Sequence, residues 1–116
     1  MNLQQCYAAL EGDYDGVVAR LHKERLVHKF ALKFLDDPSY ATLCTAIDDH
    51  DQPTAFRMAH TLKGVCQNLS FDKLFHSSHA LTEALRDQWS EDVPTLFAQV
   101  QADYRQTVDA LKLLES

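Results

Sequence analysis

The residues best suited to chemistry are an imidazole and two neighbours in residues 59–64. His60 is followed by Lys63 three residues later and by Gly64 four residues later. On a helix, positions three and four apart are neighbours on one surface. A neutral imidazole is a nucleophile, and the Lys63 ammonium would disfavour its protonated form and pair with an anion placed on the ring. The spacing therefore favours chemistry at His60 with an anionic group such as a phosphoryl group.

Gly64 needs a reason of its own, because glycine inside a helix costs about 1 kcal/mol relative to alanine. One turn from an exposed ring, a missing side chain leaves open space through which another molecule can approach. The alternative interpretation is a solvated surface histidine with an incidental glycine. The combined spacing of His60, Lys63 and Gly64 favours the functional interpretation.

The segment that must position these groups, residues 53–69, is predicted to be an amphipathic helix. Its apolar residues recur with a helical period at Ala55, Met58, Ala59, Leu62, Val65, Cys66 and Leu69. At about 100° per residue, these side chains lie within roughly 60° of Leu62. His60 lies about 160° away from Leu62 on the same projection, so it is predicted to face solvent with Gly64 beside it.

The run Ala59-His60-Thr61-Leu62-Lys63-Gly64 resembles the A-H-x-L-K-G signature of histidine-containing phosphotransfer (HPt) domains. The resemblance covers most of the chain, because the flanking helices also have the expected lengths. It implies that His60 accepts a phosphoryl group on its Nε2 atom from an aspartyl phosphate and donates it to another aspartate. The implied partners are receiver domains of response regulators or hybrid sensor kinases. The receiver would supply Mg²⁺, so we expect this chain to hold no cofactor or metal.

The resemblance also implies roles for residues near the histidine. Lys63 would stabilise charge on the transferred group, and Gly64 would leave room for the acidic pocket of the partner. Family members often place a glutamine on the following helix to hydrogen-bond the histidine, and ungapped counting puts Thr82 at that position. Gln67 is a possible substitute, or the contact is absent.

Two further features near the candidate site each allow two interpretations. Arg86 could help to hold phosphate, or it could pair with Glu83 at the i, i+3 spacing. Phe56 and Phe75 lie at the edges of apolar stripes and could form a docking patch around the histidine. Peripheral core packing is the alternative for both rings.

The fold is predicted to be all-α, a four-helix antiparallel up-and-down bundle with short additional N-terminal helices, in one HPt-like domain over residues 1–116. Ser70 is predicted to cap the helix that follows the histidine helix, at a position where most HPt domains have glycine. Residues 38–49 should extend or cross the bundle. The predicted bundle helices lie around residues 23–36, 53–69, 71–89 and 93–115.

Composition limits the remaining function classes. The net charge of −6 argues against a nucleic-acid or anionic-membrane surface, and no apolar run approaches the roughly 20 residues that span a bilayer. The N-terminus has no signal-peptide apolar region, and the three cysteines show no metal-type spacing. We therefore expect a cytoplasmic monomer whose uninterrupted last helix favours a free-standing protein.

Enzymatic alternatives find little support in the residues. With three glycines and no glycine-rich phosphate-binding loop, the chain should not be a kinase. The resemblance implies a phosphoryl carrier, with no kinase or hydrolase activity of its own expected. The Asp48-Asp49-His50-Asp51 run is interpreted as a solvated loop in which Asp51 caps the next helix, and His76 and His79 as surface imidazoles. A metal-dependent hydrolase and a helical binding module that carries no phosphate remain the other function classes.

Overall fold

The computed structural model describes residues 1–115, which form helices and no strands. The all-α prediction is therefore confirmed for these residues. The elements are α1 (Leu3–Leu10), α2 (Tyr14–Leu21), α3 (Glu24–Lys33), the 3₁₀ turn η1 (Phe34–Asp36), α4 (Ser39–Asp48), α5 (Gln52–Leu69), α6 (Asp72–Leu85) and α7 (Val93–Glu115).

Helix α5 has the start and the inward surface that its sequence predicts. The Asp51 side chain accepts a hydrogen bond from the Thr54 N–H at 3.3 Å, and Pro53 lies in the first turn. The Asp51 carboxylate satisfies one of the unpaired N–H groups at the helix start, and Pro53 has no N–H group to satisfy. The apolar stripe turns inward, because Ala55, Ala59, Leu62, Cys66 and Leu69 are all buried.

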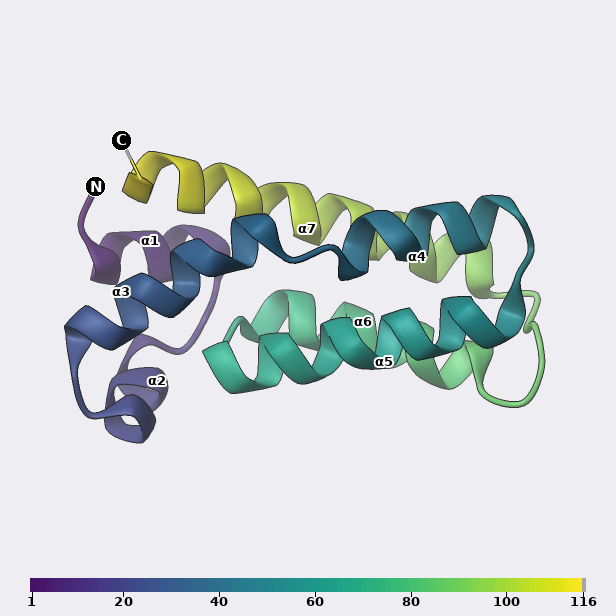
Figure 1. Cartoon of the computed structure of the whole chain (residues 1–116), viewed down its shortest axis with the longest axis horizontal. Coiled ribbons are helices and arrows are strands. Elements are labelled where there is room, and N and C mark those ends of the chain that lie inside the picture. The colour runs from purple at the N-terminus through teal and green to yellow at the C-terminus, as the bar shows by residue number, and fades with distance from the viewer. Residues whose placement is uncertain (116) are drawn as a thin grey trace.

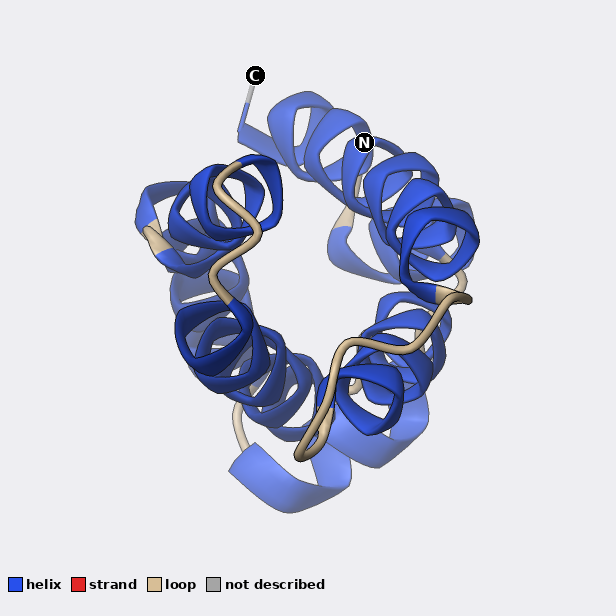
Figure 2. Cartoon of the chain, turned by 90° about the vertical axis from the view of Figure 1, so that its right-hand side faces the viewer, coloured by secondary structure: helices blue, strands red, loops and turns tan. Residues whose placement is uncertain are grey.

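The body of the molecule is built from helices that pack on their neighbours in the chain. Helix α4 lies along α5, α5 along α6, and α6 along α7 (Figure 1). Viewed along the long axis, these helices surround a common interior, which the core side chains fill (Figure 2). Helices α4 and α7 meet through the stacked rings of Tyr40 and Tyr104, whose centroids are 3.6 Å apart.

This arrangement differs from the expected one in the choice of helices. Helix α4 was expected to extend or cross the bundle, yet it runs beside α5 as a full neighbour. The segment predicted as a bundle helix, residues 23–36, instead forms α3 and η1, which lie beyond α4 at the end that α1 and α2 cover (Figure 1). The 37–38 junction breaks the line of the helix because a residue before proline avoids the helical conformation.

A polar contact network attaches α1 to the end of the bundle. The Lys73 ammonium on α6 lies 2.9 Å from Glu11 Oε2, just after α1, and 4.0 Å from the buried carboxylate of Asp103 on α7. The Tyr7 hydroxyl on α1 donates a hydrogen bond to the Leu69 carbonyl at 2.8 Å. These contacts fix the N-terminal helices against the turn between α5 and α6.

The prediction that Ser70 caps α6 is wrong. Ser70 closes α5 in the left-handed conformation, with φ 56°, and Phe71 precedes α6 without a side-chain capping bond. The Ser70 and Phe71 N–H groups bond back into the last turn of α5, and the Arg20 guanidinium donates to the Ser70 hydroxyl. Because glycine adopts this conformation readily, the serine keeps the backbone that a glycine would favour.

The predicted helix over residues 71–89 is too long, because α6 begins at Asp72 and ends at Leu85. Arg86 is extended and Asp87 is left-handed, with φ 63°, so the chain leaves the helical path there. Trp89 then stacks on His50 with ring centroids 3.7 Å apart. This contact joins the α4–α5 loop to the α6–α7 loop at the end of the bundle opposite α1.

The three cysteines are free thiols, and the two on the inner surfaces, Cys6 and Cys66, are fully buried. Burial raises the pKa of the Cys6 thiol to about 11 and raises the pKa of Cys66 as well. Both are therefore protonated near neutral pH, and a protonated thiol is a poor nucleophile. None of the helices within residues 1–115 is long and apolar enough to cross a membrane.

Candidate functional site

His60 lies in the middle of α5 and its side chain is exposed. Its ring is tilted against Phe56, one turn earlier, with centroids 6.1 Å apart. Within residues 1–115, no hydrogen bond or ion pair engages the imidazole. The ring is therefore accessible to a visiting molecule, as the helical pattern predicts.

The open space beside the histidine is present at Gly64. A Cβ atom on Gly64 would have no neighbour within 4 Å, and the residue does not have a positive φ. Neither packing nor backbone conformation therefore requires glycine here. Gly12 differs, since a Cβ there would lie 2.5 Å from the Ser70 carbonyl oxygen. Packing therefore explains the glycine at position 12 but not the one at position 64, where the space beside the helix is open.

We expect Gly64→Ala to stabilise the protein by about 1 kcal/mol, because alanine is the better helix former and its methyl group meets no atom. For a domain of this size the melting temperature should rise by about 4 °C. Thermal and urea unfolding measure both quantities. Gly12→Ala is the matched control and should destabilise the protein, because its methyl group would clash. A loss of stability in Gly64→Ala would show that the space is not open.

Lys63 lies on the side of α5 that meets α6, and its side chain is half-buried. Within residues 1–115 the ammonium group makes no ion pair. Its positive charge nevertheless affects the pKa of Glu83 on α6. A hydrogen bond from Arg86 lowers the pKa of Glu83 below its ordinary value, and the neighbouring charges of His79 and Lys63 lower it further. Lys63 is thus a cation without an ion-pair partner within residues 1–115, three residues after His60 on the same helix.

Arg86 pairs with Glu83, as one of its two interpretations predicts. The Nε and Nη2 atoms lie 3.0 and 2.7 Å from Glu83 Oε2. The same guanidinium lies over the Phe56 ring, with its Cζ atom 5.1 Å from the centroid. Since Phe56 also contacts His60, Arg86 lies on the surface that the histidine occupies.

Neither residue considered for the glutamine contact lies against His60. Thr82 is fully buried, and its hydroxyl donates a hydrogen bond to the Ser78 carbonyl at 2.7 Å, so its side chain points into the core. Gln67 is exposed, but it lies two turns beyond His60, about 10.5 Å along the helix axis. Sequence counting did not point to Glu83, an α6 residue whose pKa is lowered in part by the charge of Lys63.

Two half-buried phenylalanines flank this surface. Phe56 precedes His60 on α5, and Phe75 lies on α6 between the rings of His76 and His79, at centroid distances of 5.3 and 6.1 Å. Each ring is partly covered by the core and partly open to solvent. Both therefore pack at the edge of the core, and of the two only Phe56 contacts the His60 ring within residues 1–115.

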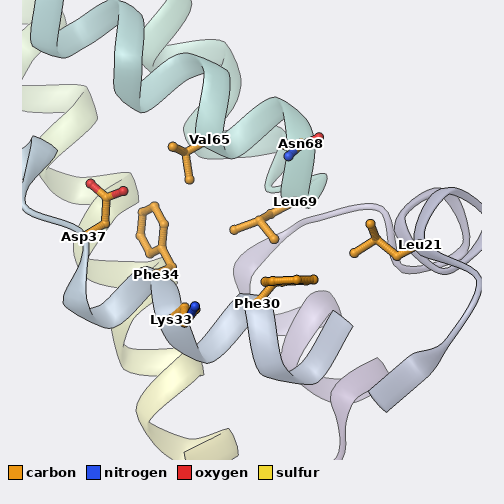
Figure 3. Close-up of a pocket in the computed structure, with 8 residues that line it drawn as sticks. All are labelled: Leu21, Phe30, Lys33, Phe34, Asp37, Val65, Asn68 and Leu69. Carbon is orange, nitrogen blue, oxygen red and sulfur yellow. The ribbon is translucent and has the colours of Figure 1, made fainter. Parts of the chain in front are cut away.

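An apolar hollow of about 260 Å³ lies where α2, α3 and η1 meet the last turns of α5 (Figure 3). Its lining residues are Leu21, Phe30, Lys33, Phe34, Asp37, Val65, Asn68 and Leu69. His60 does not line this hollow and stands on the open surface of α5. The position of the reactive group suits a macromolecular partner better than an enclosed small molecule.

The acidic run before α5 is used for structure. Asp51 caps the helix, and His50 stacks on Trp89. Within residues 1–115 no group of three or more histidine, cysteine or acidic side chains is arranged to hold a metal ion.

The helices and His60 together define a helical bundle that presents an exposed imidazole on its surface. The family model of the Hpt domain matches residues 38–112, which is more than half of the chain and includes α4 to α6 and most of α7. The chain therefore belongs to the Hpt domain family, whose members take part in phosphotransfer in two-component signalling. No curated protein and no solved structure matches it. Helices α1 to α3 lie outside the matched residues.

Proposed function

We propose that this protein is a phosphorelay carrier in which His60 receives a phosphoryl group from one receiver-domain aspartate and donates it to another. The observation that supports this most is the exposed His60 ring with open space at Gly64. The partners are receiver domains of response regulators or hybrid sensor kinases. The phosphorylated form is a phosphoprotein of the cytoplasm, and the carrier is a monomer.

The transfer follows from the geometry of the imidazole. The neutral Nε2 atom attacks the phosphorus of the aspartyl phosphate in line, and the P–O bond to the aspartate breaks as the P–N bond forms. The aspartate leaves as a carboxylate, with Mg²⁺ supplied by the receiver. Negative charge spreads over the three equatorial oxygens, and the unpaired Lys63 ammonium is placed to stabilise it. The reverse sequence passes the group to the second receiver.

Docking of the receiver uses the surface on which His60 stands. Phe56 supplies apolar contact area beside the histidine, Phe75 supplies apolar contact area on α6, and Arg86 supplies positive charge for the acidic pocket of a receiver. Helices α4 to α7 serve as the four-helix up-and-down bundle that holds this surface, while α1 to α3 cover one end.

The test is incubation of the purified protein with receiver domains from the same organism, each phosphorylated on aspartate with a radioactive label. We expect label to move to this chain with at least one receiver and to be lost in acid but retained in base, as a phosphoramidate is. Label that is stable in acid would contradict the proposal. Receiver binding without any transfer would instead support the binding module that carries no phosphate.

A further inference from the structure

We infer that Glu83 competes with the phosphoryl group on His60 for the cations of the site, and so favours donation of the group over its retention. Glu83 lies on α6, and its carboxylate holds Arg86 through contacts of 3.0 and 2.7 Å. This inference rests on the proposed function of His60. It assigns to Glu83 a regulatory role in that function.

Glu83 lies among positive groups from both helices of the hairpin. Arg86 binds its carboxylate directly, and the charge of Lys63 on α5 adds to the lowering of the Glu83 pKa that the Arg86 hydrogen bond causes. Arg86 in turn covers Phe56, which contacts His60. A phosphoryl group on His60 would carry a charge near −2 into this cluster. Glu83 and the phosphoryl group are therefore two anions that share Lys63 and Arg86.

The chemistry of the Glu83 carboxylate decides whether it stabilises or destabilises a phosphoryl group on His60. An ionised carboxylate only accepts hydrogen bonds, so Glu83 cannot donate one to a phosphoryl oxygen. The neighbouring hydroxyl that could donate, on Thr82, is turned into the core. The α6 surface near Lys63 thus offers the phosphoryl group repulsion from Glu83, which lowers the stability of the phosphorylated histidine relative to the free one.

The Arg86–Glu83 ion pair is also easy to rearrange. The two side chains are 47% and 48% exposed, and exposed ion pairs typically contribute about 0.2–1 kcal/mol. Arg86 can therefore leave Glu83 for the phosphoryl group at little cost, and return when the group departs. The carboxylate acts as a resident counter-anion that keeps Arg86 on this surface between transfers.

The test compares the equilibrium of phosphoryl transfer between a receiver and the full chain in wild type and Glu83→Gln. We expect the variant to hold about two- to fivefold more phosphorylated His60 relative to phosphorylated receiver, as the loss of an exposed charge interaction implies. In about 1 M salt the difference should nearly vanish, because the interaction is screened. Glu91→Gln, an exposed glutamate in the α6–α7 loop, is the matched control for net charge and should leave the equilibrium unchanged.

The outcomes separate this inference from the proposed function. If wild type carries phosphate and Glu83→Gln shows the wild-type equilibrium at low salt, the role of Glu83 is overturned and the function of His60 stands. If neither protein is labelled, the proposed function fails first. A shift that persists at high salt would indicate a change in packing, which thermal unfolding of both variants would detect, and would also overturn the inference.

Discussion

His60→Gln is expected to lose phosphoryl transfer from a phosphorylated receiver by a factor on the order of 10⁴ or more, because the nucleophile itself is removed. The side chain is exposed and unpaired within residues 1–115, so the fold should be unaffected, with a change in stability within about 0.5 kcal/mol. Transfer of radioactive label measures the first quantity, and thermal unfolding the second.

The matched control for His60→Gln is His76→Gln, which removes another exposed imidazole from the same helical hairpin. His76→Gln should accept label as wild type does. Receiver binding by His60→Gln should also persist, since the docking surface is intact. Equal labelling of wild type and His60→Gln would eliminate His60 as the acceptor, and loss of label in His76→Gln alone would move the assignment to α6.

Gly64→Gln is expected to slow transfer from a receiver by about 10- to 100-fold while the protein remains at least as stable as wild type. The glutamine side chain would fill the space one turn from His60, and displacement of a reactant by about 1 Å can cost a factor of 10². Stability should not fall, because glutamine is a better helix former than glycine. Single-turnover transfer kinetics and thermal unfolding measure the two effects.

Two controls separate obstruction from other causes in Gly64→Gln. Gly64→Ala adds only a methyl group and should transfer faster than Gly64→Gln. A small phosphodonor such as phosphoramidate does not need the space that a protein partner does, so it should label Gly64→Gln nearly as fast as wild type. A receiver-dependent rate equal to that of wild type would remove the steric role of the glycine.

The sequence alone predicts how the candidate residues of α5 are exposed, because one helix carries them all. The spacing of His60, Lys63 and Gly64, and the apolar stripe opposite them, are local properties of α5, and the structure agrees with each. Local periodicity is the most dependable information in a sequence, since it reports which surface of a helix is buried.

The errors arose where contacts between distant residues decide the outcome. Ser70 is a good helix start by type, yet Arg20, 50 residues earlier, binds its hydroxyl while the residue closes α5. Trp89 does not belong to α6. Its ring stacks on His50 in the α4–α5 loop, which lies about 40 residues earlier in the chain. Both contacts depend on how the helices meet in space.

Of the alternatives for the glutamine contact, Thr82 is excluded for a geometric reason. Ungapped counting selects Thr82, but one residue turns the side chain by about 100°, which separates the buried Thr82 from the exposed Glu83. The sequence did contain a signal for Glu83 in its i−4 and i+3 neighbours, His79 and Arg86. The contribution of Lys63 to the Glu83 pKa becomes apparent only when α5 and α6 are packed together.

The openness of α5 around His60 has a consequence for timing. A phosphoryl group held there would meet bulk water directly, since within residues 1–115 no hydrogen bond or ion pair engages the ring. The lifetime of the stored group is then set by the intrinsic rate of P–N hydrolysis and by how soon a receiver arrives. The time for which the group stays on His60 then depends strongly on the concentration of receivers in the cell, because nothing on α5 shields the ring from them.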